Sequence, residues 1–315
     1  MLLFALRRAG LACAIIFCAI ALLFGMIYLV PGDPASVALG PLATPEIKAA
    51  FRVRMGLDRP VIMQFLIFLG HVFTGDLGID LFSNRRVTEI VFEAMPYTVA
   101  LTACGIGWAI GLGIPLGCWS AIRRNTWLDR ITGVLAVAAI AVPSFVVALY
   151  ALLLFAVELN WFPAIGAGAG FTDRLWHLTM PAVALALAGT AYVARLTRSA
   201  TNEELDREHV DTARGRGIPE PLVIRRHVLR NAMIPITTVG GLTVAGLIAG
   251  SVVVENAFAL NGLGSYLVTS VEQKDFPVVQ AIALLLVAAF VVVNTIVDAL
   301  YGLIDPRVRV AGGAR

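Results

Sequence analysis

The sequence contains few charged residues and very little lysine. Asp, Glu, Lys and Arg make up 14% of the 315 residues, and only two of the basic residues are Lys. Apolar residues make up 59%, and the mean hydropathy is +0.85. Soluble globular domains carry about a quarter charged residues. The composition therefore excludes an ordinary soluble domain and indicates a protein surrounded by membrane lipid. The net charge of +3 is too small and too dispersed to indicate nucleic-acid binding.

Motifs for ATP hydrolysis and for common enzyme chemistry are also missing. Neither Lys48 nor Lys274 stands in a G-x-x-x-x-G-K-[ST] phosphate loop. The sequence has no H-E-x-x-H or G-x-S-x-G motif, and its four histidines share no ligand-like spacing. The four cysteines lie in apolar runs without C-x-x-C spacing, which argues against zinc sites and disulfides. We expect a protein that is not an enzyme and that binds no cofactor or metal itself.

Six apolar runs are long enough to cross a membrane as helices. A helix rises about 1.5 Å per residue, so about 20 residues cover a hydrocarbon core roughly 30 Å thick. We therefore expect an all-α integral membrane protein. The six predicted spans are residues 9–30, 97–122, 131–157, 175–194, 231–254 and 276–303.

The distribution of positive charge predicts the orientation of these spans. Lys and Arg concentrate on the cytoplasmic side of membrane proteins. If the N-terminus is inside, 16 of the 24 basic residues fall in cytoplasmic segments. Six of the other eight lie in the loop 31–95, and long loops are translocated largely regardless of their charge. We predict that both termini are cytoplasmic and that residues 31–95 and 255–275 face outward.

The first span follows Arg7 and Arg8, as the apolar core of a secretory signal peptide would. It is longer than such a core and no convincing cleavage site follows it, so a retained anchor is favoured. In the next loop, Thr44 is placed to cap a helix, and a second short helix is expected after Pro60. We divide the chain into the first span with an outer cap region (1–95), a core of five spans with a cytoplasmic loop (96–304), and a cytoplasmic tail (305–315).

Small residues recur every four positions in several spans, for example Gly113 with Gly117 and Gly246 with Gly250. This spacing lets helices approach closely in lipid, and helix packing is the favoured interpretation. Pro115, Pro143 and Pro181 could bend their spans. A pore also needs small, uncharged side chains, so we expect a cargo path along the second, third and fifth spans. Its candidate lining residues are Gly111, Ser144 and Gly246.

The predicted cytoplasmic loop, residues 195–230, has the clearest internal pattern. Thr201 or Asn202 is expected to cap a helix that has acidic residues in its first turns and ends near Gly215 or Gly217. Pro219 and Pro221 then begin a second helix that leads into the fifth span. In this helix pair, Ala213 is expected to offer a small surface to a partner.

The loop resembles one shared by permease subunits of ATP-binding-cassette importers, whose pattern is E-A-A-x-x-x-G followed by I-x-L-P. Asp211 and Thr212 replace the first two residues of this pattern, Ala213 and Gly217 match it, and the second half departs from it at His227-Val228-Leu229-Arg230. The chain further resembles the dipeptide, oligopeptide and nickel branch of these permeases at Pro31-Gly32-Asp33-Pro34, Gly75-Asp76-Leu77-Gly78, Ile114-Pro115-Leu116-Gly117, Val142-Pro143-Ser144-Phe145, Ala194-Arg195-Leu196-Thr197-Arg198, Gly262-Leu263-Gly264 and Asp305-Pro306-Arg307.

This resemblance implies a type I importer permease with six transmembrane helices in a bacterial inner membrane. It implies a homologous second permease subunit, two cytoplasmic ATP-binding subunits that use the ATP, and an external solute-binding protein. Contact with the ATP-binding subunits would fall to the loop residues Asp211, Thr212, Ala213, Gly215 and Gly217. The implied cargo is a dipeptide or oligopeptide, with nickel chelates and other small metabolites left open.

Two other classes of function are weighed against this hypothesis. An independent channel or secondary transporter would usually carry several intramembrane charges or broken-helix ion sites, and the sequence is largely without them. A membrane enzyme ranks third, because no nucleophile or metal constellation supports it.

Overall fold

The computed structural model describes residues 2–29, 33–40 and 43–304. Within these residues the fold is helical, and the one bridge between extended segments joins Ile79 to Arg86. The order of the helices is α1 (Leu2–Leu29), α2 (Pro34–Leu39), α3 (Pro45–Arg54), α4 (Val61–Thr74), α5 (Val87–Ile122), α6 (Trp127–Ala141), α7 (Ser144–Ala151), the π-helical η1 (Leu152–Glu158), α8 (Phe171–Leu205), α9 (Glu208–Gly215), α10 (Glu220–Val223), the π-helical η2 (Ile224–Leu229), α11 (Arg230–Ala257), α12 (Leu263–Gln273) and α13 (Phe276–Ile304).

Five helices are long and apolar enough to cross a membrane, namely those that contain residues 7–29, 87–122, 171–205, 235–257 and 276–297. They confirm five of the six predicted spans. The remaining predicted span, residues 131–157, is not one straight helix. It is broken between Ala141 and Ser144, where α6 and the α7–η1 pair meet at 100°. Pro143 stands in this break and has no N–H to continue the helix.

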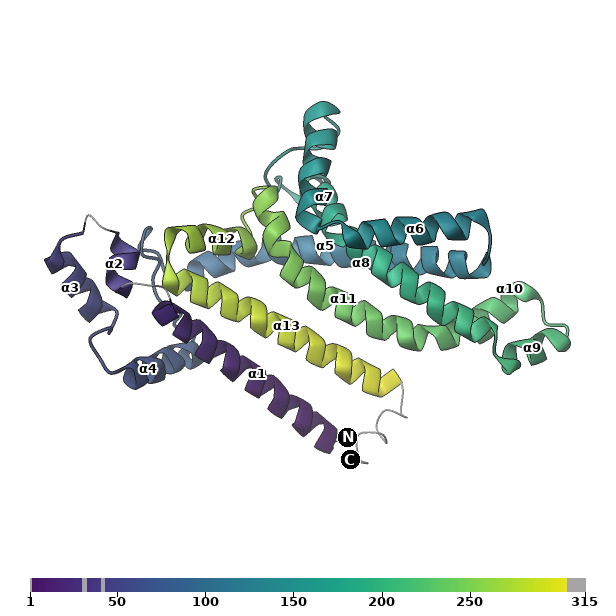
Figure 1. Cartoon of the computed structure of the whole chain (residues 1–315), viewed down its shortest axis with the longest axis horizontal. Coiled ribbons are helices and arrows are strands. Elements are labelled where there is room, and N and C mark those ends of the chain that lie inside the picture. The colour runs from purple at the N-terminus through teal and green to yellow at the C-terminus, as the bar shows by residue number, and fades with distance from the viewer. Residues whose placement is uncertain (1, 30–32, 41–42, 305–315) are drawn as a thin grey trace.

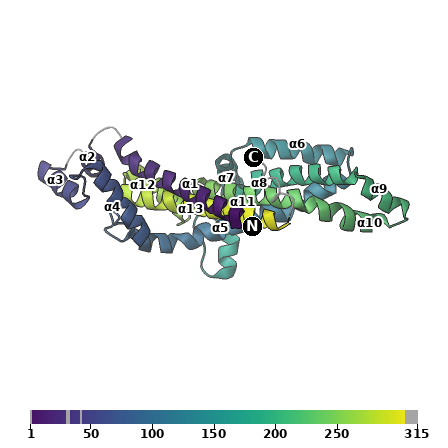
Figure 2. The ribbon, with the colours of Figure 1, turned by 90° about the horizontal axis from the view of Figure 1, so that it is seen from below.

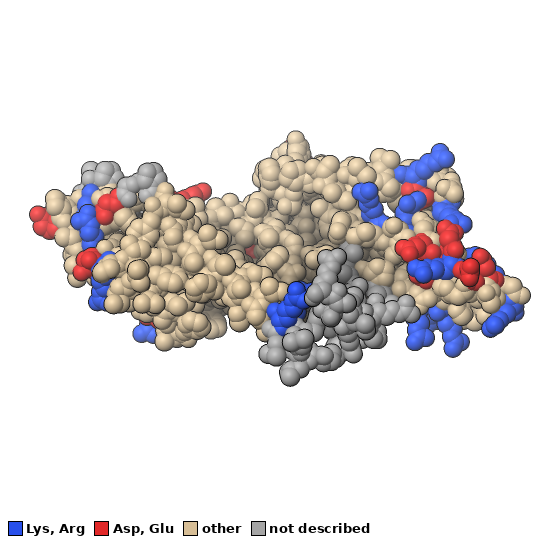
Figure 3. Space-filling view, turned by 60° about the horizontal axis from the view of Figure 1, so that its bottom comes forward, with Lys and Arg blue, Asp and Glu red and all other residues tan. Residues whose placement is uncertain are grey.

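The bundle is elongated, with α9 and α10 at one end and α2–α4 and α12 at the other (Figure 1). Figure 2 shows the same two ends after a quarter turn, with α5, α8, α11 and α13 running along the length between them. We call these ends the α9 end and the α12 end. Charged side chains gather at both, and the face between them in Figure 3 is almost free of charge apart from one basic patch beside the undescribed residues. This pattern is expected where lipid surrounds the middle of a protein.

Helix α8 lies at the centre, in contact with α5, α6, α7 and α11. It meets α5 along a row of small residues. A Cβ atom on Gly113 would lie 2.8 Å from Val193 Cβ, and one on Gly117 would overlap the Ala194 carbonyl oxygen. The prediction that Gly113 and Gly117 pack helices together is confirmed. Pro115 and Pro181 lie inside α5 and α8, which run on through both positions.

The α12 end carries the predicted short helices. Thr44 caps α3, because its hydroxyl accepts the Ile47 amide at 3.4 Å, and α4 follows Pro60 as predicted. Helix α4 rests on α1 through aromatic contacts of Phe24 with Phe65 and Phe68. The predicted domain boundary between residues 95 and 96 lies inside α5.

Candidate coupling and transport sites

The predicted cytoplasmic loop folds as a helical hairpin at the α9 end. Neither Thr201 nor Asn202 caps a helix, which corrects the prediction, because α8 continues to Leu205. Thr201 is fully buried within α8. The loop helix α9 begins at Glu208 instead, with Glu208 and Asp211 in its first turn, where acidic side chains favour the positive end of the helix dipole.

The hairpin has an apolar core of its own. Val210 and Ala213 of α9 pack with Leu205, Val223 and Val228, and Ile218 lies against this cluster. Burial in a shared core makes α9, α10 and η2 one unit attached to the end of α8. The expectation that the Ala213 side chain offers a docking surface is wrong, because it is only 4% exposed and faces this core. The exposed residues among those predicted to couple are Asp211, Thr212, Gly215 and Gly217.

Gly217 makes the turn between the two helices, as predicted. Its φ is +75°, in the left-handed region that favours glycine. The Gly217 amide donates to the Arg214 carbonyl at 2.9 Å, and the Ile218 amide donates to the Ala213 carbonyl at 3.3 Å. These two bonds and the apolar Ile218 form a Schellman motif, which ends a helix and reverses the chain.

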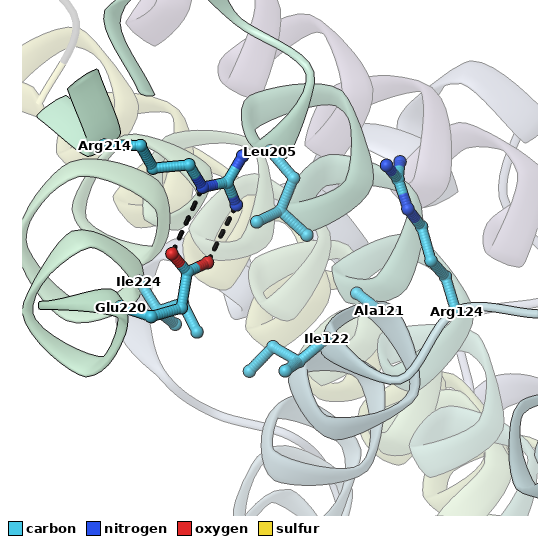
Figure 4. Close-up of a pocket in the computed structure, with 7 residues that line it drawn as sticks. All are labelled: Ala121, Ile122, Arg124, Leu205, Arg214, Glu220 and Ile224. Atoms are coloured by element: carbon cyan, nitrogen blue, oxygen red, sulfur yellow. Dashed lines mark hydrogen bonds and ion pairs between the residues drawn. The ribbon is translucent and has the colours of Figure 1, made fainter. Parts of the chain in front are cut away.

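An ion pair between Arg214 of α9 and Glu220 of α10 links the two helices next to this turn. Arg214 donates to both carboxylate oxygens of Glu220, with Nη2–Oε1 at 2.8 Å and Nε–Oε2 at 3.1 Å. The Arg214 guanidinium lowers the pKa of the Glu220 carboxyl below its usual value. Figure 4 shows the pair at one wall of a cavity of about 100 Å³. The other walls come from the end of α5 and its following turn, including Ile122 and Arg124, and from Leu205 of α8 and Ile224 of η2. No local sequence pattern pointed to Glu220, because its partner precedes it across the turn.

The three residues predicted to line a path lie on three different helices. Gly111 on α5 and Gly246 on α11 are exposed, and a Cβ added at either would meet no atom within 4 Å. Ser144 is half-buried at the start of α7, directly after the break. Neither glycine is needed for close helix packing in this chain, in contrast to Gly113 and Gly117.

A groove of about 410 Å³ runs between α5 and α8 near Gly111. It is lined by Cys104, Gly107, Trp108, Leu175 and Thr179. Gly111 lies one turn beyond Gly107 on α5, and so on the same side of that helix. The five lining side chains carry no charge. Among the described residues, no group of three or more His, Cys, Asp or Glu could hold a metal ion.

Comparison with known proteins identifies the family. Residues 113–310 match the model of the binding-protein-dependent transport system inner membrane component, and residues 1–102 match the model of its N-terminal part. The glutathione transport system permease protein GsiC of Pectobacterium atrosepticum is 42% identical over 91% of this chain and 92% of its own length. The protein of the same name from Salmonella choleraesuis is 38% identical over 96% of this chain and 97% of its own.

A solved structure supports the fold. A chain of the MetNI methionine ABC transporter, in an inward-facing conformation, superposes with a TM-score of 0.59 over 69% of this chain and 96% of that chain, at 17% identity. Proteins of this kind work with ATP-hydrolysing and solute-binding partners. The chain therefore belongs to the family of inner membrane components of binding-protein-dependent transport systems, and it is a pore-forming permease subunit of an ATP-driven importer with a type I fold.

Proposed function

We infer that this permease imports peptide-like solutes together with a homologous second permease, two cytoplasmic ATP-binding subunits and an external solute-binding protein. The relatives described above are named for glutathione, which is a tripeptide. The uncharged α5–α8 groove suits a solute that meets the wall mainly through its backbone and apolar parts. ATP is bound and used by the partner subunits, and this chain catalyses no covalent reaction.

The observation that carries the coupling proposal is the α9 hairpin at the end of two very long helices. Helices α5 and α8 have 36 and 35 residues, whereas about 20 residues cross a bilayer. Their surplus turns must extend beyond the hydrocarbon, and at the α9 end they carry the compact hairpin into water. The Arg-rich hairpin then lies in the cytoplasm, as the distribution of positive charge predicts. Its exposed residues Asp211, Thr212, Gly215 and Gly217 contact an ATP-binding subunit.

The proposal is tested by purifying the chain with its candidate partners and measuring uptake in proteoliposomes. We expect two ATP-binding subunits to co-purify with a permease pair, and glutathione or a short peptide to enter only with ATP and the binding protein. Flux by the isolated chain that follows an ion or proton gradient would instead establish a channel or secondary carrier. ATP-dependent uptake of other solutes, with none of the tested peptides imported, would support the importer function and contradict the peptide cargo.

A further inference from the structure

An ion pair with one buried member joins α6 to α8 close to the hairpin: the Arg198 side chain is 40% exposed, whereas Asp129 is buried. The Asp129 side chain, in the first turn of α6, is 4% exposed. Arg198 of α8 donates two hydrogen bonds to its carboxylate, from Nε to Oδ1 at 2.6 Å and from Nη2 to Oδ2 at 2.8 Å. Paired bonds of this kind fix both distance and orientation between two helices.

Two further donors complete the environment of the Asp129 carboxylate. The Ser120 hydroxyl, from the end of α5, donates to Oδ1 at 2.5 Å. The amide of Asn125, in the α5–α6 turn, donates to Oδ2 at 3.1 Å. Asn125 has a φ of +67°, so the turn adopts a left-handed conformation to present that amide. The carboxylate therefore holds α5, the α5–α6 turn and α8 at one point.

The position of this pair relates it to the hairpin. Arg198 lies about two turns before Leu205, where α8 ends and the chain passes into α9. Arg124, in the same turn as Asn125, pairs with Asp206 just after α8 at 2.7 Å. At the other end of α6 lies the 100° break before Ser144. One helix, α6, thus connects the Asp129–Arg198 pair to the break beside a predicted lining residue.

The net contribution of such a pair to the stability of the fold is small. Burial of the Asp129 carboxylate costs desolvation free energy that its attraction to the partly exposed Arg198 largely offsets. What the pair supplies is a fixed register between α6 and α8. We propose that Asp129 and Arg198 are positioning residues that make α6 move with α8, so that movement of the α9 hairpin reaches the break at Pro143. This inference rests on the coupling role proposed for the hairpin.

The test uses the complete transporter and the double variant Asp129→Asn/Arg198→Gln. Arg198→Gln alone leaves the buried Asp129 carboxylate without its charged partner and is expected to assemble poorly. The double variant removes both charges, so its assembly and thermal stability should stay near those of the wild type. We expect the number of solute molecules that this variant imports per ATP hydrolysed to fall at least about fivefold, which is in the range of ordinary coupling between sites. Glu203→Gln, which breaks an exposed pair with Arg207 at the same end, is the matched control and should leave this ratio unchanged.

A distance measurement tests whether the Asp129–Arg198 pair makes α6 and α8 move together. Spin labels at Val137 of α6 and Tyr192 of α8, both exposed, report the spacing of the two helices. In the otherwise unaltered transporter this spacing should be the same with and without ATP, and in the double variant it should differ between the two. Two results would overturn the proposed coupling of α6 to α8 while leaving the hairpin proposal intact. One is a wild-type number of solutes imported per ATP in the double variant, and the other is a spacing that already changes with ATP in the unaltered transporter. A hairpin that makes no contact with the ATP-binding subunits would instead overturn the proposed function.

Discussion

Glu255, near the end of α11, accepts the amide hydrogen of Gly264 at the start of α12, with 2.7 Å between Oε2 and the nitrogen. The Ser265 amide donates to the same oxygen at 3.4 Å. The fully buried Glu255 carboxyl group therefore caps the N-terminus of α12 by accepting two of the backbone amide hydrogens of its first turn. The close approach depends on Gly264, because a Cβ there would overlap Val252 Cα of α11.

The first prediction follows from this contact. Gly264→Ala should destabilise the chain by about 1–3 kcal/mol or more, because the neighbour that it meets is backbone and cannot turn away. Thermal unfolding of the purified chain measures the loss. Gly133→Ala on α6 is the control, since a Cβ there meets nothing within 4 Å. Equal unfolding temperatures for the two variants would show that the α11–α12 contact is not tight.

Contacts between side chains and backbone of separate helices, such as this one, explain much of what the sequence could not predict. Hydropathy located five of the six predicted spans as single helices, because a helix needs about 20 mainly apolar residues to cross the hydrocarbon core. Glu255 was expected on the outward-facing segment 255–275, yet it is buried, because its partners come from α12 and no local pattern encodes them. Asp129 and Arg198 are 69 positions apart, and each alone resembles an ordinary charge at a helix end.

The two errors in helix boundaries have local causes. Thr201 and Asn202 are good caps at a helix start, but the same residues are accepted inside a helix when packing continues it, as in α8. Proline disfavours helix continuation without fixing an angle, so Pro115 stays inside α5 while Pro143 stands at a 100° break. Gly217 was predicted correctly because the left-handed turn is a local requirement that glycine meets best.

The second prediction concerns orientation. In a background without the four cysteines, Ser83→Cys and Glu272→Cys should react with a membrane-impermeant thiol reagent added outside intact cells. Glu208→Cys, on the hairpin, should react only after the membrane is opened. All three positions are exposed. The reverse labelling pattern would contradict cytoplasmic termini and the outward-facing segments together.

The third prediction separates path lining from packing. Gly111→Leu and Gly246→Leu add side chains where the structure has open space, so assembly should persist while uptake falls. Ser144→Phe, at the break before α7, should likewise lower uptake without loss of assembly. Gly113→Leu is the contrast, because its side chain would collide with Val193 and should impair assembly itself. Co-purification of partner subunits and uptake, measured on the same preparations, distinguish the two outcomes.

The fourth prediction is a pH dependence of the hairpin. Arg214 lowers the pKa of Glu220 in the folded chain below its ordinary value of 4.5. The pair therefore contributes stability above about pH 4.5, and this contribution is lost as the pH falls through the lowered pKa. Both side chains are substantially exposed, so the contribution should not exceed about 1 kcal/mol. The difference in unfolding temperature between the wild type and Glu220→Gln should thus be small at pH 7 and shrink further as the pH falls below 4.5. A difference that grows on acidification would contradict this assignment.

The last prediction tests Gly217 as the turn on which hairpin geometry depends. At a φ of +75°, a β-branched residue is disfavoured by about 1–2 kcal/mol or more. Gly217→Val should therefore open the Schellman turn and misplace α9 relative to α10. The spans are untouched, since no atom lies within 4 Å of the position where the Cβ would be added. We expect normal membrane insertion and binding-protein docking, with loss of the ATP-binding subunits or of solute-stimulated ATP hydrolysis. Gly217→Asn should lose less, because Asn enters the left-handed region more readily than Val. Wild-type uptake and wild-type stimulated hydrolysis in Gly217→Val would show that the hairpin does not couple the permease to its ATPase.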